Sequence, residues 1–296
     1  MSRRGLALFI ALSVIWGTPY LFIRIAVTSV EPSVMVALRV GLAALLLLPI
    51  AAARGEFTGV RKYLPWIALF GVVEVTGPFL LLGYAETALP SSTTALLIAA
   101  VPIVAAILAR SMGLDRRLGW GRILGLAIGF SGVALLVGLD IPRDQTWAVG
   151  AAALTVIGYA LGPIIISTKL AGAPGLAVIT IALALNAVLY APIAWVQRPT
   201  EPVPAEAWWS IAVLGVLCTA IAFLIFFALV REVGPSRMTV ITFLNPAVAV
   251  ALGVVVLSEP ITLGLALGFP LVLVGSYLAT RPDRSRAAQV EDVPHA

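Results

Sequence analysis

The chain has 296 residues, of which 61% are hydrophobic and 11% are charged, and its formal net charge at pH 7 is +5. Soluble domains contain roughly 45–50% apolar and about 25% charged residues, so this composition excludes an ordinary water-soluble enzyme. A helix that spans a bilayer needs about 20 mostly apolar residues, and ten such helices would use about 200 residues. Little of the chain would remain for a soluble domain.

Apolar segments follow one another along the chain, separated by proline, glycine or charged residues. The first begins after basic residues, as in a signal peptide, but Gly17, Thr18 and Pro19 interrupt any cleavage site, so we expect a retained helix. Runs such as residues 40–50 lack the alternation of a membrane β-barrel, so we expect an all-α integral membrane protein. The ten expected spans are residues 5–27, 34–53, 64–84, 91–110, 119–139, 147–168, 175–196, 207–230, 236–257 and 261–280.

Basic residues predict the orientation, because lysine and arginine near helix ends are retained on the cytoplasmic side. With the N-terminus inside, that side collects Arg3, Arg4, Arg54, Arg61, Lys62, Arg110, Arg116, Arg117, Arg122, Lys169, Arg231, Arg237, Arg281, Arg284 and Arg286. Only Arg143 and Arg198 lie on the other side. We therefore expect both termini in the cytoplasm of a bacterium, the protein in its inner membrane, and no role for the positive charge in nucleic-acid binding. Seven acidic residues are expected outside: Glu31, Glu86, Asp140, Asp144, Glu201, Glu206 and Glu259.

The two halves of the chain match when one is shifted by 143 to 145 residues. Gly17 then meets Gly162, and Pro90-Ser91 meets Pro235-Ser236. The matches predict a first five-helix repeat at 1–140, a second at 146–281, and a cytoplasmic tail at 282–296. Because five is odd, the repeats must enter the bilayer from opposite sides, which is typical of secondary transporters.

Several short motifs carry a family resemblance. They are Trp-Gly-Thr-Pro at 16–19, Pro-Ser-Ser-Thr-Thr-Ala at 90–95, Pro102 inside the same expected span, and Ser-Glu-Pro-Ile-Thr at 258–262. In this order and spacing the chain resembles the drug/metabolite transporter superfamily, and within it the ten-helix EamA-type branch that includes YddG-like amino-acid exporters. The resemblance implies a gradient-driven or facilitative carrier of small metabolites, with a central cavity between the repeats.

Ionisable residues within the bilayer are functional candidates, because a charge at its centre costs roughly 2.5–3.5 kcal/mol even on insertion scales. Arg24 and its counterpart Lys169 lie near helix ends, where we expect anchoring rather than substrate contact. Arg39 is expected about 8 Å from the outer boundary and Glu74 about 15 Å from the inner one, so the arginine could reach the glutamate.

Neither deep charge has a charged counterpart in the other half, where Ala182 and Thr219 stand. We hypothesise that Glu74 faces the cavity and binds a substrate ammonium group, with the carriage of a coupled proton as a further role. The alternative is a carboxyl group that is neutralised by Arg39 or by protonation.

Aromatic and amide side chains predict the remaining cavity wall, although lipid-facing positions and interhelical hydrogen bonding are the alternatives. With the two charged residues, the candidate substrate-binding residues are Glu74, Arg39, Trp16, Tyr20, Phe79, Tyr159, Phe223, Phe227 and Asn245.

Proline and glycine indicate which helices move and which pack tightly. Three proline pairs recur in both halves and predict matched kinks that act as hinges: Pro19 with Pro163, Pro49 with Pro192, and Pro102 with Pro246. Glycines at 121, 125 and 129 in the fifth span and at 264 and 268 in the tenth predict close packing of these two helices. Homodimerisation is the alternative use of these faces, and we expect a monomer.

Other chemistries lack the residues they need. Cys218 and His295 are the single cysteine and histidine, which excludes a disulfide framework and a His/Cys metal site, and no phosphate-binding G-x-x-x-x-G-K-[ST] loop occurs. We expect neither catalysis nor a cofactor. One arginine, one glutamate and aromatic walls favour export of amino acids, with nucleotide sugars or amphipathic drug-like compounds as an alternative. A receptor or assembly subunit without transport is the alternative from another class.

Overall fold

Ten consecutive groups of helices follow the ten apolar segments of the sequence, in a computed structural model that describes residues 2–114, 119–233 and 241–280. Within these ranges there is no strand, and nine helical segments are long and apolar enough to cross a membrane. The remaining group is the shorter apolar helix α14 (Ile241–Val256). The predicted all-α membrane fold is thus confirmed, whereas the side on which the termini lie stays a prediction.

The helices of the first half are arranged as five spans. They are α1 (Arg3–Gly17) with α2 (Pro19–Ala26); α3 (Pro32–Ala53); η1 (Val60–Tyr63), α4 (Leu64–Phe70), η2 (Gly71–Thr76) and α5 (Gly77–Ala88); α6 (Ser91–Ile98) with α7 (Val101–Ser111); and α8 (Trp120–Asp140). The expected third span ended at residue 84, but the structure continues it to Ala88.

The second half repeats this order. Its spans are η3 (Arg143–Gln145) with α9 (Thr146–Lys169); α10 (Gly175–Val196); α11 (Ala205–Gly215), η4 (Val216–Ile221) and α12 (Ala222–Val233); α14; and α15 (Leu263–Thr280). The predicted tail at 282–296 lies outside the described residues, as do Arg116, Arg117, Arg237, Arg281, Arg284, Arg286, Pro235, Ser236 and His295.

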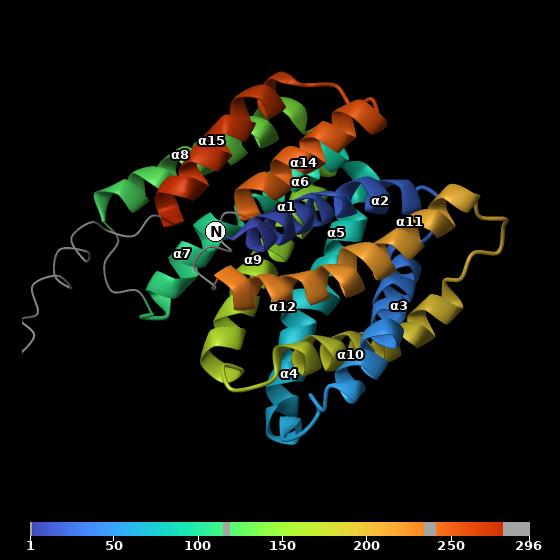
Figure 1. The fold of residues 1–296 in the computed structure, drawn as a ribbon. Coiled ribbons are helices and arrows are strands. Elements are labelled where there is room, and N and C mark those ends of the chain that lie inside the picture. Colours follow the sequence, from blue (N-terminus) through green and yellow to red (C-terminus); the bar gives the residue numbers. More distant parts are fainter. Residues whose placement is uncertain (1, 115–118, 234–240, 281–296) are drawn as a thin grey trace, which may run out of the picture.

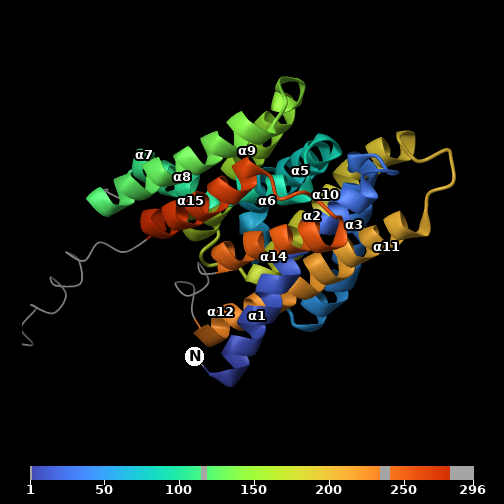
Figure 2. The same cartoon turned by 90° about the horizontal axis from the view of Figure 1, so that it is seen from above.

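Equivalent helices of the two halves pack against each other. The pairs α3 with α10, α6 with α14, and α8 with α15 are all in contact, and Figures 1 and 2 show α8 and α15 side by side at one edge of the bundle. The contact of α1 with α14 is matched by that of α9 with α7. Contacts between equivalent elements are those that a two-fold relation between the halves produces, and the odd number of spans in each half makes that relation an inversion across the bilayer.

Glycine lets α8 and α15 approach closely, as predicted for the fifth and tenth spans. A Cβ atom added at Gly132 would lie 2.8 Å from Leu271 Cβ and 2.9 Å from the carbonyl oxygen of Gly268. The contact uses Gly125, Gly129 and Gly275 as well, whereas the predicted Gly121 has nothing within 4 Å. Small residues therefore replace side-chain interdigitation with backbone contact along this pair.

Two acidic side chains each cap a helix of the other half. Glu259 Oε1 accepts a hydrogen bond from Ser91 N (2.7 Å) and its Oε2 accepts one from Ser92 N (2.9 Å), at the start of α6. Asp140 Oδ1 accepts from Gly264 N (3.0 Å) and its Oδ2 from Leu265 N (2.8 Å), at the start of α15. These carboxylates satisfy N–H groups that a helix cannot bond internally and lie at the positive end of its dipole.

The proline pairs are less symmetric than predicted. Pro19 follows a break between α1 and α2, and Pro102 follows one between α6 and α7, but Pro163 and Pro246 lie inside the continuous helices α9 and α14. At the second break Ala100 N bonds to Leu97 O (3.1 Å), so the chain tightens into a narrower turn where the proline lacks an N–H. Both members of the remaining pair lie inside helices: Pro49 in α3 and Pro192 in α10.

Candidate functional site

Each half carries one π-helical segment at the same position, near the middle of its third span. These segments are η2 and η4, and they contain Glu74 and its counterpart Thr219. A π-helical turn displaces the regular hydrogen-bond ladder and occurs frequently at functional sites. Side chains complete the bonding: Asn186 Nδ2 donates to Gly71 O (3.3 Å), and Tyr190 Oη donates to Thr76 O (2.6 Å).

Arg39 extends from α3 toward the π-helix of the second half. Its Nε donates to Thr219 Oγ1 at 3.0 Å, and its Cζ lies 3.9 Å from the centroid of the Phe79 ring. Only 5% of the residue is exposed. Among the described residues no acceptor bonds to Nη1 or Nη2. The N–H groups of both nitrogens therefore remain free to donate to a ligand inside the bundle.

Glu74 packs against another helix and does not contact Arg39, so the alternative in which Arg39 neutralises Glu74 has no support in the described residues. No ion pair joins Glu74 to Arg39 within the described residues, because Thr219 and Phe79 hold the guanidinium while Glu74 packs against Gly162 of α9. The Oε2 atom of Glu74 is inaccessible and has no hydrogen-bond partner. The two deep charges therefore remain separately available.

Tyr20, Tyr159 and a second glutamate surround Arg39. All three interact electrostatically with the guanidinium: Tyr20 from α2, Tyr159 from α9, and Glu86 from α5. Glu86 was expected outside the membrane, but it is 0% exposed and lies inside the bundle, because α5 continues past the last strongly apolar residues. Pro90 was the available signal, since a helix tends to end at the residue before a proline rather than where hydropathy falls.

A cluster of four aromatic rings joins α1 to α12. The centroid of Trp16 lies 6.0 Å from that of Phe223 and 5.5 Å from that of Phe226, and the rings of Phe223 and Phe227 are stacked at 6.4 Å. Phe226 was not predicted, although it lies three residues after Phe223 on the same helix. Trp16 of α1 joins this cluster, whereas Tyr20 of α2 belongs to the polar group around Arg39.

Asn245 joins α14 to α1. Its amide nitrogen donates to Ile241 O (3.1 Å) and to Ser13 O (3.0 Å) in the orientation that satisfies both groups. Interhelical bonding, the alternative considered for this residue, therefore accounts for its nitrogen. Of the nine candidate residues, Arg39, Phe79, Tyr20 and Tyr159 lie together, while Trp16, Phe223 and Phe227 form the aromatic cluster.

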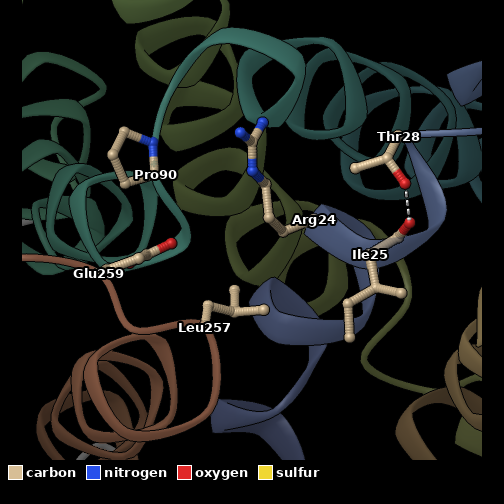
Figure 3. A pocket seen from close by; sticks show the side chains of 6 residues that line it. All are labelled: Arg24, Ile25, Thr28, Pro90, Leu257 and Glu259. Atoms are coloured by element: carbon tan, nitrogen blue, oxygen red, sulfur yellow. Dashed lines mark hydrogen bonds between the residues drawn. The ribbon is translucent and has the colours of Figure 1, made fainter.

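Arg24 and Lys169 act at helix ends, as their anchoring role predicts. Arg24 Nη1 donates to the carbonyl oxygens of Glu86 and Thr87 at the end of α5, and Lys169 Nζ lies 4.7 Å from the Trp66 ring centroid. Arg24 and Glu259 also line a pocket of about 330 Å³. Figure 3 shows Pro90 and Glu259 on one side of Arg24 and Ile25 and Thr28 on the other. The pocket lies at the end of the bundle that is predicted to face outward.

Comparisons with known proteins agree with this architecture. The model of the EamA-like transporter family matches residues 3–138 and again 146–281. The "uncharacterized inner membrane transporter YedA" of Escherichia coli (strain K12) is 30% identical over 283 residues, which cover 92% of this chain and 91% of that protein. A "probable terminal-alkyne amino-acid exporter" of Streptantibioticus cattleyicolor is 30% identical over 273 residues, covering 90% of this chain and 87% of that protein.

A solved structure shows the same fold. A crystal structure superposes with a TM-score of 0.67 at 19% sequence identity and covers 93% of this chain and 96% of the other. At this identity the likeness concerns the fold only.

Proposed function

Since the chain belongs to the EamA-like transporter family of the drug/metabolite transporter superfamily, it is a membrane transporter, and we propose that it exports amino acids. In this proposal the substrate passes by alternating access through a central cavity between the two halves. It is a multi-pass protein of the bacterial inner membrane, like its relatives. The named amino-acid exporter among those relatives supports the proposed substrate class.

One observation carries the proposal: Arg39 presents a buried guanidinium whose Nη1 and Nη2 bond to no acceptor in the described residues. An arginine fork matches a carboxylate in shape and charge, so a substrate carboxylate is the natural acceptor. Glu74, a partly buried carboxyl group whose Oε2 has no hydrogen-bond partner, supplies the complementary site for an ammonium group. A zwitterion satisfies both groups at once, whereas a phosphorylated substrate would call for several cations.

The aromatic cluster favours a second candidate, amphipathic drug-like compounds. Trp16, Phe223, Phe226 and Phe227 offer a large apolar surface between α1 and α12 that needs no charge on the ligand. Transport of such compounds would depend on these rings and would not change when Arg39 is substituted.

Flux into liposomes that contain only this protein tests the proposal. The panel comprises amino acids, nucleotide sugars and cationic dyes, each with and without a proton gradient. We expect saturable amino-acid flux above that of empty liposomes. Flux of the dyes or nucleotide sugars without amino-acid flux would contradict amino-acid export in favour of the other substrates, and no flux of any kind would contradict transport by this chain alone.

Two substitutions assign the charged groups. A hydrogen bond to a charged group contributes about 1.5–3 kcal/mol, which corresponds to about 10–140-fold in affinity. Arg39→Lys should weaken transport of amino acids by this factor but spare their amides, which lack the carboxylate. Glu74→Gln should weaken transport of amino acids but leave transport of analogues without the amino group unchanged.

The control is Glu201→Gln, which removes an exposed carboxylate in the connection between α10 and α11. It should leave all affinities unchanged. Equal losses for a substrate and its truncated analogue would show that the altered residue supports the structure and does not bind the missing group.

A further inference from the structure

Glu86 is a completely buried carboxyl group without a hydrogen-bond partner. It lies in the last turn of α5, is 0% exposed, and neither Oε1 nor Oε2 bonds to a donor within the described residues. Buried carboxyl oxygens almost always have a partner, because leaving them unpaired costs several kcal/mol. No described residue donates a hydrogen bond to either oxygen, although the main chain of Arg24 runs close to the carboxyl group, so both acceptors are left for a donor from outside the chain.

The charged side chains near Glu86 donate no hydrogen bond to its carboxyl oxygens. Arg24 is the nearest cation along α2, but its Nη1 donates to the main-chain carbonyls of Glu86 and Thr87 and not to the carboxyl group. From α3, Arg39 bonds to Thr219. Glu259, in the segment before α15, accepts its bonds from the start of α6.

The tyrosines on the neighbouring helices complete the surroundings. Tyr20 of α2 and Tyr159 of α9 both interact electrostatically with Glu86. Tyr159 also interacts electrostatically with Glu74, so it is within electrostatic range of both carboxyl groups. Twelve positions separate Glu74 from Glu86 along one span, or about 18 Å at 1.5 Å per residue.

We propose that Glu86 is a second ammonium-binding subsite, which holds the amino group of the substrate nearer the predicted outer end than Glu74 does. The inference rests on the proposed amino-acid transport. The subsite lies between the polar group around Arg39 and the pocket that Arg24 and Glu259 line, and Figure 3 shows that pocket where the chain passes from α5 to α6. Glu74, Tyr159 and Glu86 then line a path for a cationic group toward that pocket.

An ammonium group fits this position better than a metal ion does. Calcium takes six to eight oxygen ligands, and the described residues contain no group of three or more acidic, histidine or cysteine side chains that could hold a metal. A primary ammonium has three donors, which one carboxylate and tyrosine hydroxyl oxygens can accept. The ligand class is therefore a primary amine that also carries the carboxylate recognised by Arg39.

If Glu86 is such a subsite, its substitution should change KM differently for substrate presented at the outer and at the inner face. The experiment measures this difference. In proteoliposomes of known orientation, KM is determined for an amino acid and for its analogue without the amino group, presented at one face at a time. Glu86→Gln should raise KM for the amino acid about tenfold or more at the predicted outer face and leave the inner face within about twofold. Glu74→Gln should show the opposite sidedness, and neither should affect the analogue.

Two further variants keep the result interpretable. Glu86→Asp retains the charge on a shorter side chain and should restore the preference for the amine at the outer face, at a weaker affinity than the unaltered protein. Glu201→Gln removes an exposed carboxylate and should change neither face. Monodisperse elution from size exclusion in detergent shows that each variant is folded.

The outcomes separate this inference from the proposed function. If Glu86→Gln slows transport of the amino acid and of its analogue equally, or leaves KM unchanged at both faces, Glu86 is not a binding subsite. The proposed amino-acid transport would still stand. If the unaltered protein moves no amino acid at all, the proposed function fails and the subsite with it.

Discussion

Replacing Gly275 by alanine tests the packing of α15 on α8. A Cβ atom at this position would lie 2.7 Å from the carbonyl oxygen of Gly125 and still closer to the backbone of Gly129. Ordinary contact begins at 3.4 Å, so the two helices would have to part by about 0.7 Å or more. All three neighbouring atoms belong to the backbone and cannot turn away as a side chain could.

The expected loss of stability follows from two opposing terms. Overpacking of this kind costs about 1–3 kcal/mol, and alanine regains about 1 kcal/mol over glycine through helix propensity. With three backbone atoms in conflict, we expect a net loss of about 1–2 kcal/mol. On the scale of large soluble domains, where 1 kcal/mol corresponds to about 2–4 °C, the apparent Tm should fall by about 2–8 °C.

The assay is thermal unfolding of the purified protein in detergent, followed by tryptophan fluorescence. The matched control is Gly121→Ala on α8, where an added Cβ meets nothing within 4 Å. This variant should keep or raise the Tm, because only the propensity term acts. If Gly275→Ala is as stable as Gly121→Ala, the close backbone approach of these helices does not determine their packing.

Two further predictions concern helix ends and prolines. Asp140→Ala should lower the free energy of unfolding by about 0.5–2 kcal/mol, because it removes the cap on α15. The control, Asp144→Ala, removes an exposed neighbouring carboxylate and should have no effect. Equal melting curves for the two variants would refute the capping role. Pro102→Ala and Pro246→Ala should lower the transport rate with little change in KM if these prolines act as hinges. Full rates in both variants, at normal membrane insertion, would exclude that role.

Hydropathy and the 143-to-145-residue shift predict the features of this fold that depend on composition. Ten spans, the pairing of the fifth with the tenth, and the helix-end role of Arg24 follow from apolar length, small residues and the cost of burying charge. Arg24 nevertheless complements the end of α5 and not that of its own helix. Sequence periodicity places a residue along one helix and says little about which neighbouring helix it meets.

The candidate site is predictable only in part, for the same reason. Arg39 and Glu74 follow from their depth, but whether they pair depends on Thr219 of the eighth span and Phe79 of the third, both of which contact the guanidinium. Glu86 was placed outside because apolar character ends before the helix does. The π-helical segments have no signal in Gly-Val-Val-Glu-Val-Thr or Val-Leu-Cys-Thr-Ala-Ile, since tertiary partners such as Asn186 stabilise them.

The exchange of caps between the halves also affects how the protein is made. The start of α6 enters the membrane 168 residues before its acceptor, Glu259, has been synthesised. At about 5–20 residues per second, the ribosome leaves these N–H groups without their carboxylate for roughly 8–34 s. Until the segment after α14 has been made, the N–H groups of Ser91 and Ser92 at the start of the fourth span need another acceptor, such as water. The first half of this transporter cannot complete its own structure, and assembly is finished only from the far end of the chain.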